Sequence, residues 1–187
     1  MKNQDTDKTL LITQIAEIFR ECGFAGTSLS RITGRTGLGK GSLYHFFPAG
    51  KNEMAATVLA NVDGWFAVHI FQPLELGAPR EAIEVMWRAV DDYFRSGQRI
   101  CLLGAFALDD TRDRFAPAIN AYFTRWIAAL RQTCVRGGID GRTAAALAEE
   151  TVAGIQGALT LARGLNDGAF FGRSLQRLRL RIDRAWP

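Results

Sequence analysis

The spacing of apolar residues constrains the fold of this chain more than any other feature. Intervals of three and four residues separate Leu11, Ile15, Ile18, Phe19 and Cys22, which places them on one face of a helix that Gly23 is expected to end. Further helical patterns cover about 51–71, 80–96, 100–109, 113–136, 141–165 and 172–184. We find no convincing strand alternation, internal repeat or low-complexity tract. The sequence therefore predicts an all-α protein of about nine helices.

Length and composition narrow the class of protein. The chain has 187 residues, 48% of them hydrophobic, which suits one domain or a small module joined to a larger one. No run of about 18 uncharged apolar residues occurs, and this argues against a membrane span. The N-terminus also lacks the apolar core of a signal peptide. We expect a cytoplasmic protein with no membrane partner.

Three cysteines and two histidines are the candidate metal ligands. Cys22, Cys101 and Cys134 lie far apart, and His45 and His69 add no zinc-type spacing. We interpret the cysteines as reduced core thiols and predict neither a metal nor a cofactor. The net charge is +4, and all four lysines fall within the first 51 residues. This basic segment is a weak indication of a polyanionic partner.

Three short helices are predicted at the N-terminal end. Thr27 or Ser28 can cap the second helix, and Gly37 can end it in the left-handed conformation. The third runs from about Gly39 to Phe46, and Pro48 prevents its continuation. This is a helix-turn-helix arrangement, in which one helix fits the major groove of DNA and its neighbour braces it. A small core would hold the pair together, made by Leu29, Ile32, Leu38 and Leu43.

Polar groups around the third helix suit DNA. Lys40 and Lys51 lie near predicted helix N-termini, where a cation is unfavourable unless an anion such as a phosphate binds there too. Ser42, Tyr44 and His45 offer hydrogen-bond donors to phosphates and base edges. The alternative is a solvated basic turn beside an aromatic core. We favour that alternative for Phe46 and Phe47, and DNA contact for Tyr44.

Residues 6–66 resemble the DNA-binding domain of TetR-family transcriptional repressors. The likeness runs through "IAEIFRECGFAGTSLSRIT" and "GLGKGSLYHFFP", followed by a lysine that opens the fourth helix. Thr33 departs from the family's usual alanine, and "PAGK" has one residue more than the common pattern, in a form similar to the LmrA/YxaF-like subgroup. The extra residue leaves the register of Lys51 open. The resemblance implies DNA contacts from Ser28, Ser30, Lys40, Gly41, Ser42, Tyr44, His45 and Lys51.

The resemblance also implies that residues 67–187 bind a small effector and form a homodimer. Within 141–165, Gly154 and Gly157 interrupt a helix rich in alanine, and a mid-helix glycine calls for a packing reason. A partner helix across a dimer interface is one such reason, and close packing within the chain is the other. The segment 172–184 alternates leucine with arginine and can be read as a strand or a helix. The resemblance favours a helix.

Large side chains on the central helices are the candidates for an effector cavity. The cavity residues that we predict are Trp65, Phe66, His69, Trp87, Phe94, Cys101, Phe106, Phe123 and Trp126. Such residues suit a mainly apolar or aromatic effector, although most aromatic stripes are simply core. Cys101 has Arg99 two residues before it at the start of a helix, an environment that can activate a thiol as an electrophile or oxidant sensor. The alternative is a buried, inert cysteine.

Enzyme chemistry finds little support. Asp109 and Asp110 are adjacent on a helix and cannot share one reacting atom. "GLGKGS" resembles a phosphate-binding loop but has no preceding strand. The prediction is therefore a dimeric repressor that binds a palindromic double-stranded operator and is released by an effector. A helical carrier or enzyme without DNA binding, and a constitutive DNA-binding protein without an effector, are the alternatives.

Overall fold

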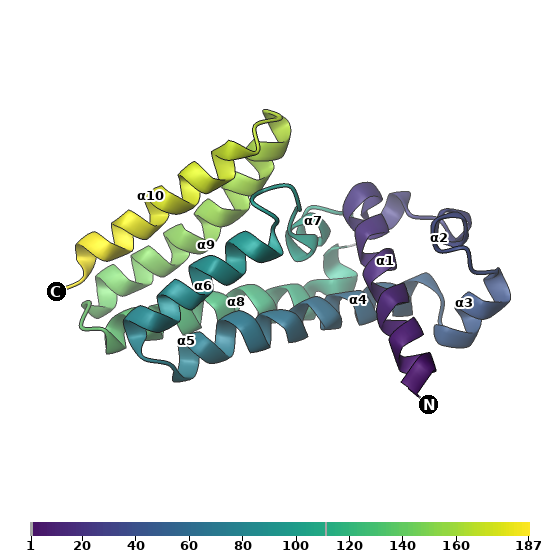
Figure 1. Cartoon of the computed structure of the whole chain (residues 1–187), viewed down its shortest axis with the longest axis horizontal. Coiled ribbons are helices and arrows are strands. Elements are labelled where there is room, and N and C mark those ends of the chain that lie inside the picture. The colour runs from purple at the N-terminus through teal and green to yellow at the C-terminus, as the bar shows by residue number, and fades with distance from the viewer. Residues whose placement is uncertain (1, 111) are drawn as a thin grey trace. The chain divides into compact units, whose positions relative to one another are not determined.

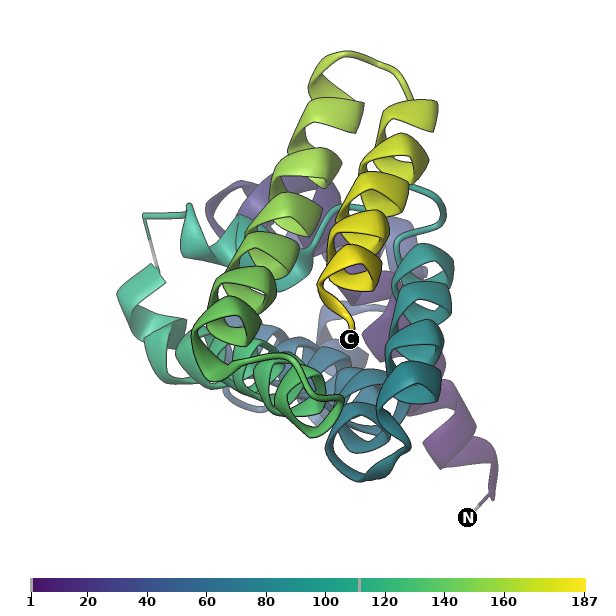
Figure 2. The same ribbon diagram turned by 90° about the vertical axis from the view of Figure 1, so that its left-hand side faces the viewer.

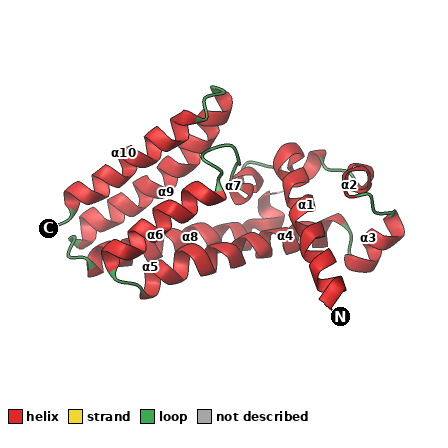
Figure 3. Cartoon of the chain, in the orientation of Figure 1, coloured by secondary structure: helices red, strands yellow, loops and turns green. Residues whose placement is uncertain are grey.

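The computed structural model describes residues 2–110 and 112–187, with side chains described from residue 8 onward. Every regular element in these residues is a helix, which confirms the predicted all-α class (Figures 1 and 3). In chain order they are α1 (Lys2–Gly26), α2 (Leu29–Thr36), α3 (Lys40–Phe46), α4 (Lys51–Phe66), the π-helix η1 (Ala67–Phe71), α5 (Gln72–Leu76), α6 (Pro79–Tyr93), α7 (Leu102–Ala107), α8 (Arg112–Arg136), α9 (Gly141–Gly164) and α10 (Ala169–Ala185).

The chain forms two compact units. The first comprises Met1–Gly64 with Leu102–Ile119, and the second comprises Trp65–Cys101 with Asn120–Pro187. From the sequence we expected two consecutive segments, 6–66 and 67–187. The units differ from that division because α7 and the start of α8 pack with the first unit, although part of the second unit precedes them in the chain.

Aromatic rings hold α7 and the start of α8 in the first unit. The Phe106 ring lies 5.7 Å from Phe19 and 6.0 Å from Phe24, and Phe115 lies 5.3 Å from Phe24, measured between ring centroids. All four rings are buried. Gly23, where we predicted the first helix to stop, has a φ of 67° and interrupts α1 just before Phe24. The break lets Phe24 turn into this cluster.

The fourth predicted helix extends further than expected. After α4 the backbone passes through η1, where the Gln72 N–H donates to the Ala67 carbonyl five residues back. Pro73 then lies in the first turn of α5, where a missing N–H is tolerated. The predicted break over 72–79 therefore begins only at Gly77, which follows α5. Local sequence patterns gave no sign of the π-helical turn.

The helical run Lys51–Leu76 has the length and composition of a helix that can cross a membrane, with a mean hydropathy of 1.3 in its most apolar window. In that window, 44% of the residues are buried inside the protein. Met54 and Val58 are buried in the first unit and Ile70 in the second. A core helix meets the same criteria, so the run is weak evidence for a membrane.

In the second unit, α9 and α10 lie side by side as a helical hairpin in both views (Figures 1 and 2). A Cβ atom added at Gly154 would lie 2.9 Å from the methyl groups of Leu178 on α10. Packing within the chain therefore accounts for Gly154. A Cβ at Gly157 would meet no atom within 4 Å, so this glycine faces open space. The ambiguous segment 172–184 lies in α10 and is helical.

Candidate DNA-binding surface and effector region

Two local caps position the helices of the first unit's turn. The Ser28 hydroxyl accepts a hydrogen bond of 3.2 Å from the Arg31 N–H and caps α2, as predicted. Gly37 has a φ of 72°, and its N–H donates to the Thr33 carbonyl at 2.9 Å. The side chain of Thr33, which replaces the alanine usual in the family, donates to the Ser30 carbonyl. This hydrogen bond satisfies the hydroxyl at that position.

Three side chains anchor the turn from the inside. Ile32, Leu43 and Phe47 are each at most 1% exposed. Leu29 and Leu38, which we expected in the same core, are half-buried, and so is Phe46. Because α3 has seven residues and buries only Leu43, most of its side chains remain at the surface.

The predicted DNA contacts on α2 and α3 are exposed. We define the recognition surface as Ser28, Ser30, Lys40, Gly41, Ser42, Tyr44 and His45, all of which are exposed. The Tyr44 side chain is the one large apolar group among them, at 46% exposure. The hydroxyls of Ser28 and Ser30 lie 2.8 Å apart and form one polar point beside the start of α2. This surface offers donors, one cation and an aromatic ring, which suit phosphates and base edges.

Lys51 is placed differently from the other predicted contacts. Its ammonium donates to the carbonyls of Phe24 and Thr27, at 3.0 Å each, and lies 4.3 Å from the centroid of the Phe24 ring. It therefore satisfies backbone carbonyls just after the kink in α1. An ammonium has three hydrogens, so one is left for a phosphate. The predicted DNA contact of Lys51 stays a prediction, and the lysine also connects α4 to α1.

Two residues that contact the end of α1 or Asn52, the neighbour of Lys51, were not assigned this role from the sequence. The Arg114 guanidinium lies 5.6 Å from the Phe24 ring centroid and donates to the Asn52 side chain. The Asp109 carboxylate accepts from the Ala25 N–H at 3.5 Å. Both residues come from the 102–119 segment of the first unit, and they hold the end of α1. The contacts are tertiary, and no spacing in the sequence indicates them.

A packed aromatic cluster fills part of the second unit. The Phe66 ring centroid lies 4.8 Å from Tyr93, 4.9 Å from Tyr122 and 5.2 Å from Trp126. Phe66, Tyr122, Trp126 and the neighbouring Phe94 are fully buried. Within the described residues, the Trp126 indole N–H has no hydrogen-bond acceptor. The predicted effector residue Phe66 thus packs against two others of the set, Phe94 and Trp126.

Two of the other predicted effector residues, Trp65 and His69, adjoin this cluster, because the Trp65 ring centroid lies 5.4 Å from Phe66 and 4.5 Å from Tyr93. His69 is exposed and stacks on the half-buried Trp65, with ring centroids 4.3 Å apart, at the turn of η1. Phe123 is half-buried on α8. Phe106 belongs to the core of the first unit, because its ring packs on Phe19, Phe24 and Phe115, and the structure therefore separates it from the rest of the predicted set.

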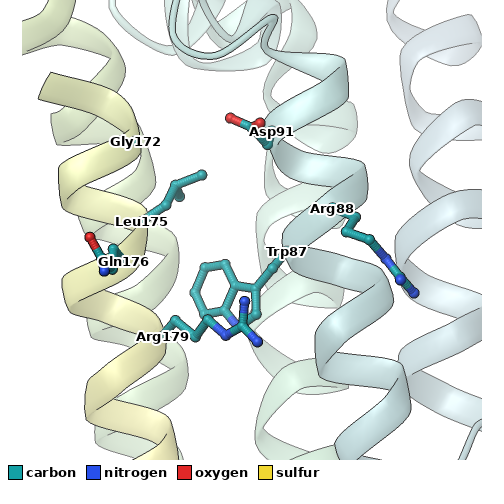
Figure 4. A pocket seen from close by; sticks show the side chains of 7 residues that line it. All are labelled: Trp87, Arg88, Asp91, Gly172, Leu175, Gln176 and Arg179. Carbon is teal, nitrogen blue, oxygen red and sulfur yellow. The ribbon is translucent and has the colours of Figure 1, made fainter. Parts of the chain in front are cut away.

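Trp87, also in the predicted set, lines a surface groove of about 300 Å³ between α6 and α10 (Figure 4). The residues around the groove are Trp87, Arg88, Asp91, Gly172, Leu175, Gln176 and Arg179. They all belong to the second unit. The sequence offers no local signal for this groove, because its two walls, α6 and α10, are far apart in the sequence.

Two of the three thiols, Cys101 and Cys134, are buried and poorly placed for chemistry. Cys101 is 5% exposed and precedes the short helix α7. Cys134 is fully buried, and burial raises the pKa of its thiol to about 11, so it stays neutral near pH 7. Cys22 is the more accessible of the three. Among residues 2–110 and 112–187, no group of three His, Cys, Asp or Glu side chains is arranged to hold a metal ion.

Two family models match separate parts of the chain. The family model for bacterial regulatory proteins of the tetR family matches residues 11–58. The model for the C-terminal domain of LmrA/YxaF-like transcriptional regulators matches residues 79–174, just over half of the chain. The uncharacterized HTH-type transcriptional regulator Rv0196 of Mycobacterium tuberculosis is 28% identical over 169 residues, which cover 84% of each chain. The uncharacterized regulator YxaF of Bacillus subtilis is 29% identical over 102 residues, 54% of this chain and 53% of that protein.

Solved structures share the fold at low sequence identity. A TetR transcriptional regulator from Legionella pneumophila superposes with a TM-score of 0.79 at 20% identity and covers 95% of both chains. A TetR transcriptional regulator from Chloroflexus aurantiacus also has a TM-score of 0.79, at 23% identity, over 100% of this chain and 98% of that one. The likeness spans both compact units, and at this identity it shows the fold alone.

Proposed function

Because the chain belongs to the TetR family of bacterial transcriptional regulators, we propose that it is a ligand-responsive repressor. It binds a palindromic operator as a homodimer and occludes the promoter, and a small, mainly apolar effector releases it. Such a repressor acts in the cytoplasm and catalyses no reaction. The effector can shift the equilibrium between the DNA-binding state and the released state only by the difference between its binding free energies for the two states.

The observation that supports DNA binding most directly is the exposure of the recognition surface around a helix with a buried anchor. Leu43 faces the interior of the first unit at 1% exposure, while Lys40, Ser42, Tyr44 and His45 remain at the surface. In our proposal α3 enters the major groove. Ser28 and Ser30 contact the backbone or a base edge beside it, and Lys40, Tyr44 and His45 contact phosphates. Lys51 holds the end of α1 and donates its remaining hydrogen to a phosphate of the DNA backbone.

Exposed apolar and small residues on α9 and at its C-cap, Leu165, support a homodimer. Ala153 and Gly157 are exposed, and Leu161 and Leu165 are 48% and 60% exposed. A second copy of α9 can approach closely at such residues, and a two-fold axis presents the same face of each copy to the other. The dimer would place two recognition helices in successive major grooves, about 34–36 Å apart.

The aromatic cluster of the second unit supports an apolar effector, because binding sites for small molecules are lined mainly by such side chains. The same cluster also favours a second candidate function. Phe66, Tyr122 and Trp126 already pack on one another. A constitutive DNA-binding protein with its interior filled by side chains would look like this. Only the repressor changes its DNA affinity when a ligand is added.

The test is fluorescence anisotropy of the purified protein with the DNA immediately upstream of its own gene. A scrambled duplex of the same composition is the matched control, and both are titrated at several salt concentrations. We expect salt-sensitive binding that prefers the upstream sequence. Equal, weak binding to both duplexes would indicate that the operator is not in this upstream DNA but elsewhere in the genome. The absence of binding at low salt would contradict the proposal and favour a helical carrier.

A further inference from the structure

We propose that the groove between α6 and α10 binds a flat aromatic carboxylate. Trp87 forms its floor, and Arg179 binds the anionic end. The groove lies within the second unit and measures about 300 Å³, at the lower end of the range for small-molecule pockets. The buried aromatic cluster around Phe66 is a different region, so this site is separate from the interior of the unit.

The floor of the groove is apolar but contains one unsatisfied donor. Trp87 is 5% exposed and Leu175 is 8% exposed. Among the described residues, the Trp87 indole N–H has no hydrogen-bond acceptor. Buried polar groups are nearly always paired, so the unpaired N–H of this groove-lining residue is the observation from which we infer an acceptor outside the chain. The indole face favours a planar ring, and its N–H favours a ligand oxygen.

The two ends of the groove carry opposite charges. Arg179 extends from α10 toward the Trp87 indole, and Asp91 lies further along α6, while Arg88 points away from α10 (Figure 4). Arg179 Nη2 pairs with Glu84 at 2.7 Å, and both side chains are partly exposed. A guanidinium has five N–H donors, so this pairing leaves others for a carboxylate. The anionic group of a ligand is therefore expected at the Arg179 end, away from Asp91.

The opposite wall leaves room for a ring. Gly172 lies on α10 at the edge of the groove, and an added Cβ there would meet no atom within 4 Å. A leucine at this position would extend into the part of the groove near Asp91 without a backbone clash (Figure 4). Its φ is not in the left-handed region, so the substitution is compatible with the helix.

The regulatory consequence rests on the proposed function: a ligand here would be an effector of the repressor. Binding itself is measured without DNA, so the two ideas can fail separately. The probe is 2-naphthoate, with 2-naphthamide as its uncharged counterpart. The readout is the indole N–H region of a ¹⁵N-correlated NMR spectrum of the full-length protein, in which the Trp87 signal is identified by its loss in Trp87→Phe.

We expect 2-naphthoate to shift the Trp87 indole signal saturably and more than those of Trp65, Trp126 and Trp186. Calorimetry should show Trp87→Phe weakening binding by about three- to tenfold, the effect of one neutral hydrogen bond. Gly172→Leu should weaken it by about tenfold or more, because the leucine fills part of the groove. Gly164→Leu, at a glycine with equally open surroundings on α9, should bind as the parent does. The amide should bind more weakly than the carboxylate.

Three results would overturn the proposal. One is the absence of any shift of the Trp87 indole signal at millimolar 2-naphthoate. The same result is expected if a second copy of the chain covers the groove, and it would overturn the proposal in that case too. Another is binding that survives Gly172→Leu, and the third is equal affinity for the amide. If 2-naphthoate binds as expected but leaves operator affinity unchanged, the site stands and its regulatory role fails. If the protein binds no DNA, the proposed function fails while the ligand site stands.

Discussion

Aromatic residues are exposed on α3 of the first unit but buried in the interior of the second unit. On α3, Tyr44 is 46% exposed and sits next to the exposed His45. On α8, Tyr122 and Trp126 are fully buried. The difference lies in the length and surroundings of the helices. With seven residues, α3 buries one side chain, whereas α8 has 25 residues, and the rings of Tyr122 and Trp126 pack on Phe66.

This contrast indicates how the two regions can be altered. The part of the recognition surface on α3 consists of exposed residues, and each of their side chains can be removed without disturbing a core. The aromatic cluster is cooperative, and removing one ring leaves a cavity among the others. We therefore expect mutations in the first region to change binding and mutations in the second to change stability.

The largest effect is expected from Trp126→Ala. Deleting a fully buried tryptophan should lower the free energy of unfolding by about 3–5 kcal/mol. Urea denaturation followed by circular dichroism measures it. Phe123→Ala on the same helix is the control, because Phe123 is half-buried and should cost clearly less. Equal losses from the two variants would remove the distinction between the cluster and the rest of α8.

The second prediction concerns Tyr44→Phe. The change removes one hydroxyl from an exposed side chain, so the free energy of unfolding should stay within about 0.5 kcal/mol of the parent. If the hydroxyl donates to a phosphate, operator affinity should fall by about 1.5–3 kcal/mol, the range for hydrogen bonds to charged groups. Anisotropy titrations and thermal melts separate the two quantities. Unchanged affinity would exclude the proposed contact of the hydroxyl.

Two lysines of the first unit are expected to differ in their effect on DNA binding. Lys40→Ala should weaken binding to all sequences and reduce the slope of log K against log salt by about 0.9, the effect of one phosphate contact. Lys51→Ala should reduce the slope by less, because two of its ammonium hydrogens go to the Phe24 and Thr27 carbonyls. It should also destabilise the first unit. A full unit of slope lost in Lys51→Ala would show that the phosphate contact dominates.

The smallest effects are expected from the thiols. With Ellman's reagent near pH 8, Cys22 of the first unit should react in the folded protein, whereas Cys134 of the second should react only on unfolding. Burial raises the pKa of Cys134 to about 11 in the folded state. Its contribution to stability is therefore complete below the pKa of an unfolded thiol, about 8.5, and is lost as the pH rises toward 11. Cys134→Ala should flatten the stability profile in that window, and a profile unchanged by the substitution would exclude this linkage.

Much of the first unit could be predicted from the sequence because its determinants are local. The Ser28 cap, the left-handed Gly37 and the start of α3 at Lys40 each depend on residues only a few positions apart. The kink at Gly23 belongs to the same class. The TetR resemblance rested on these positions, and the family comparison confirmed it.

The contacts that depend on distant parts of the chain were not predictable in the same way. Phe106 looked like a cavity residue, yet it packs on Phe19 and Phe24 across more than 80 positions of sequence. The groove at Trp87 needs Leu175 from the far end of the chain. Amphipathic spacing identifies which residues are buried, but it does not identify the partner that buries them.

The π-helical turn at Ala67–Phe71 also has a meaning for sequence alignment. A π turn holds one residue more than an α turn, and the hydrogen bond from Gln72 to Ala67 marks its position. A relative with an unbroken α-helix here would align with a gap of one residue near this turn. An alignment that forbids gaps inside helices would instead shift every following position of α5 by about 100° around the helix axis. Placing the gap at this turn would restore the correspondence between Leu74 and the equivalent buried residue of such a relative.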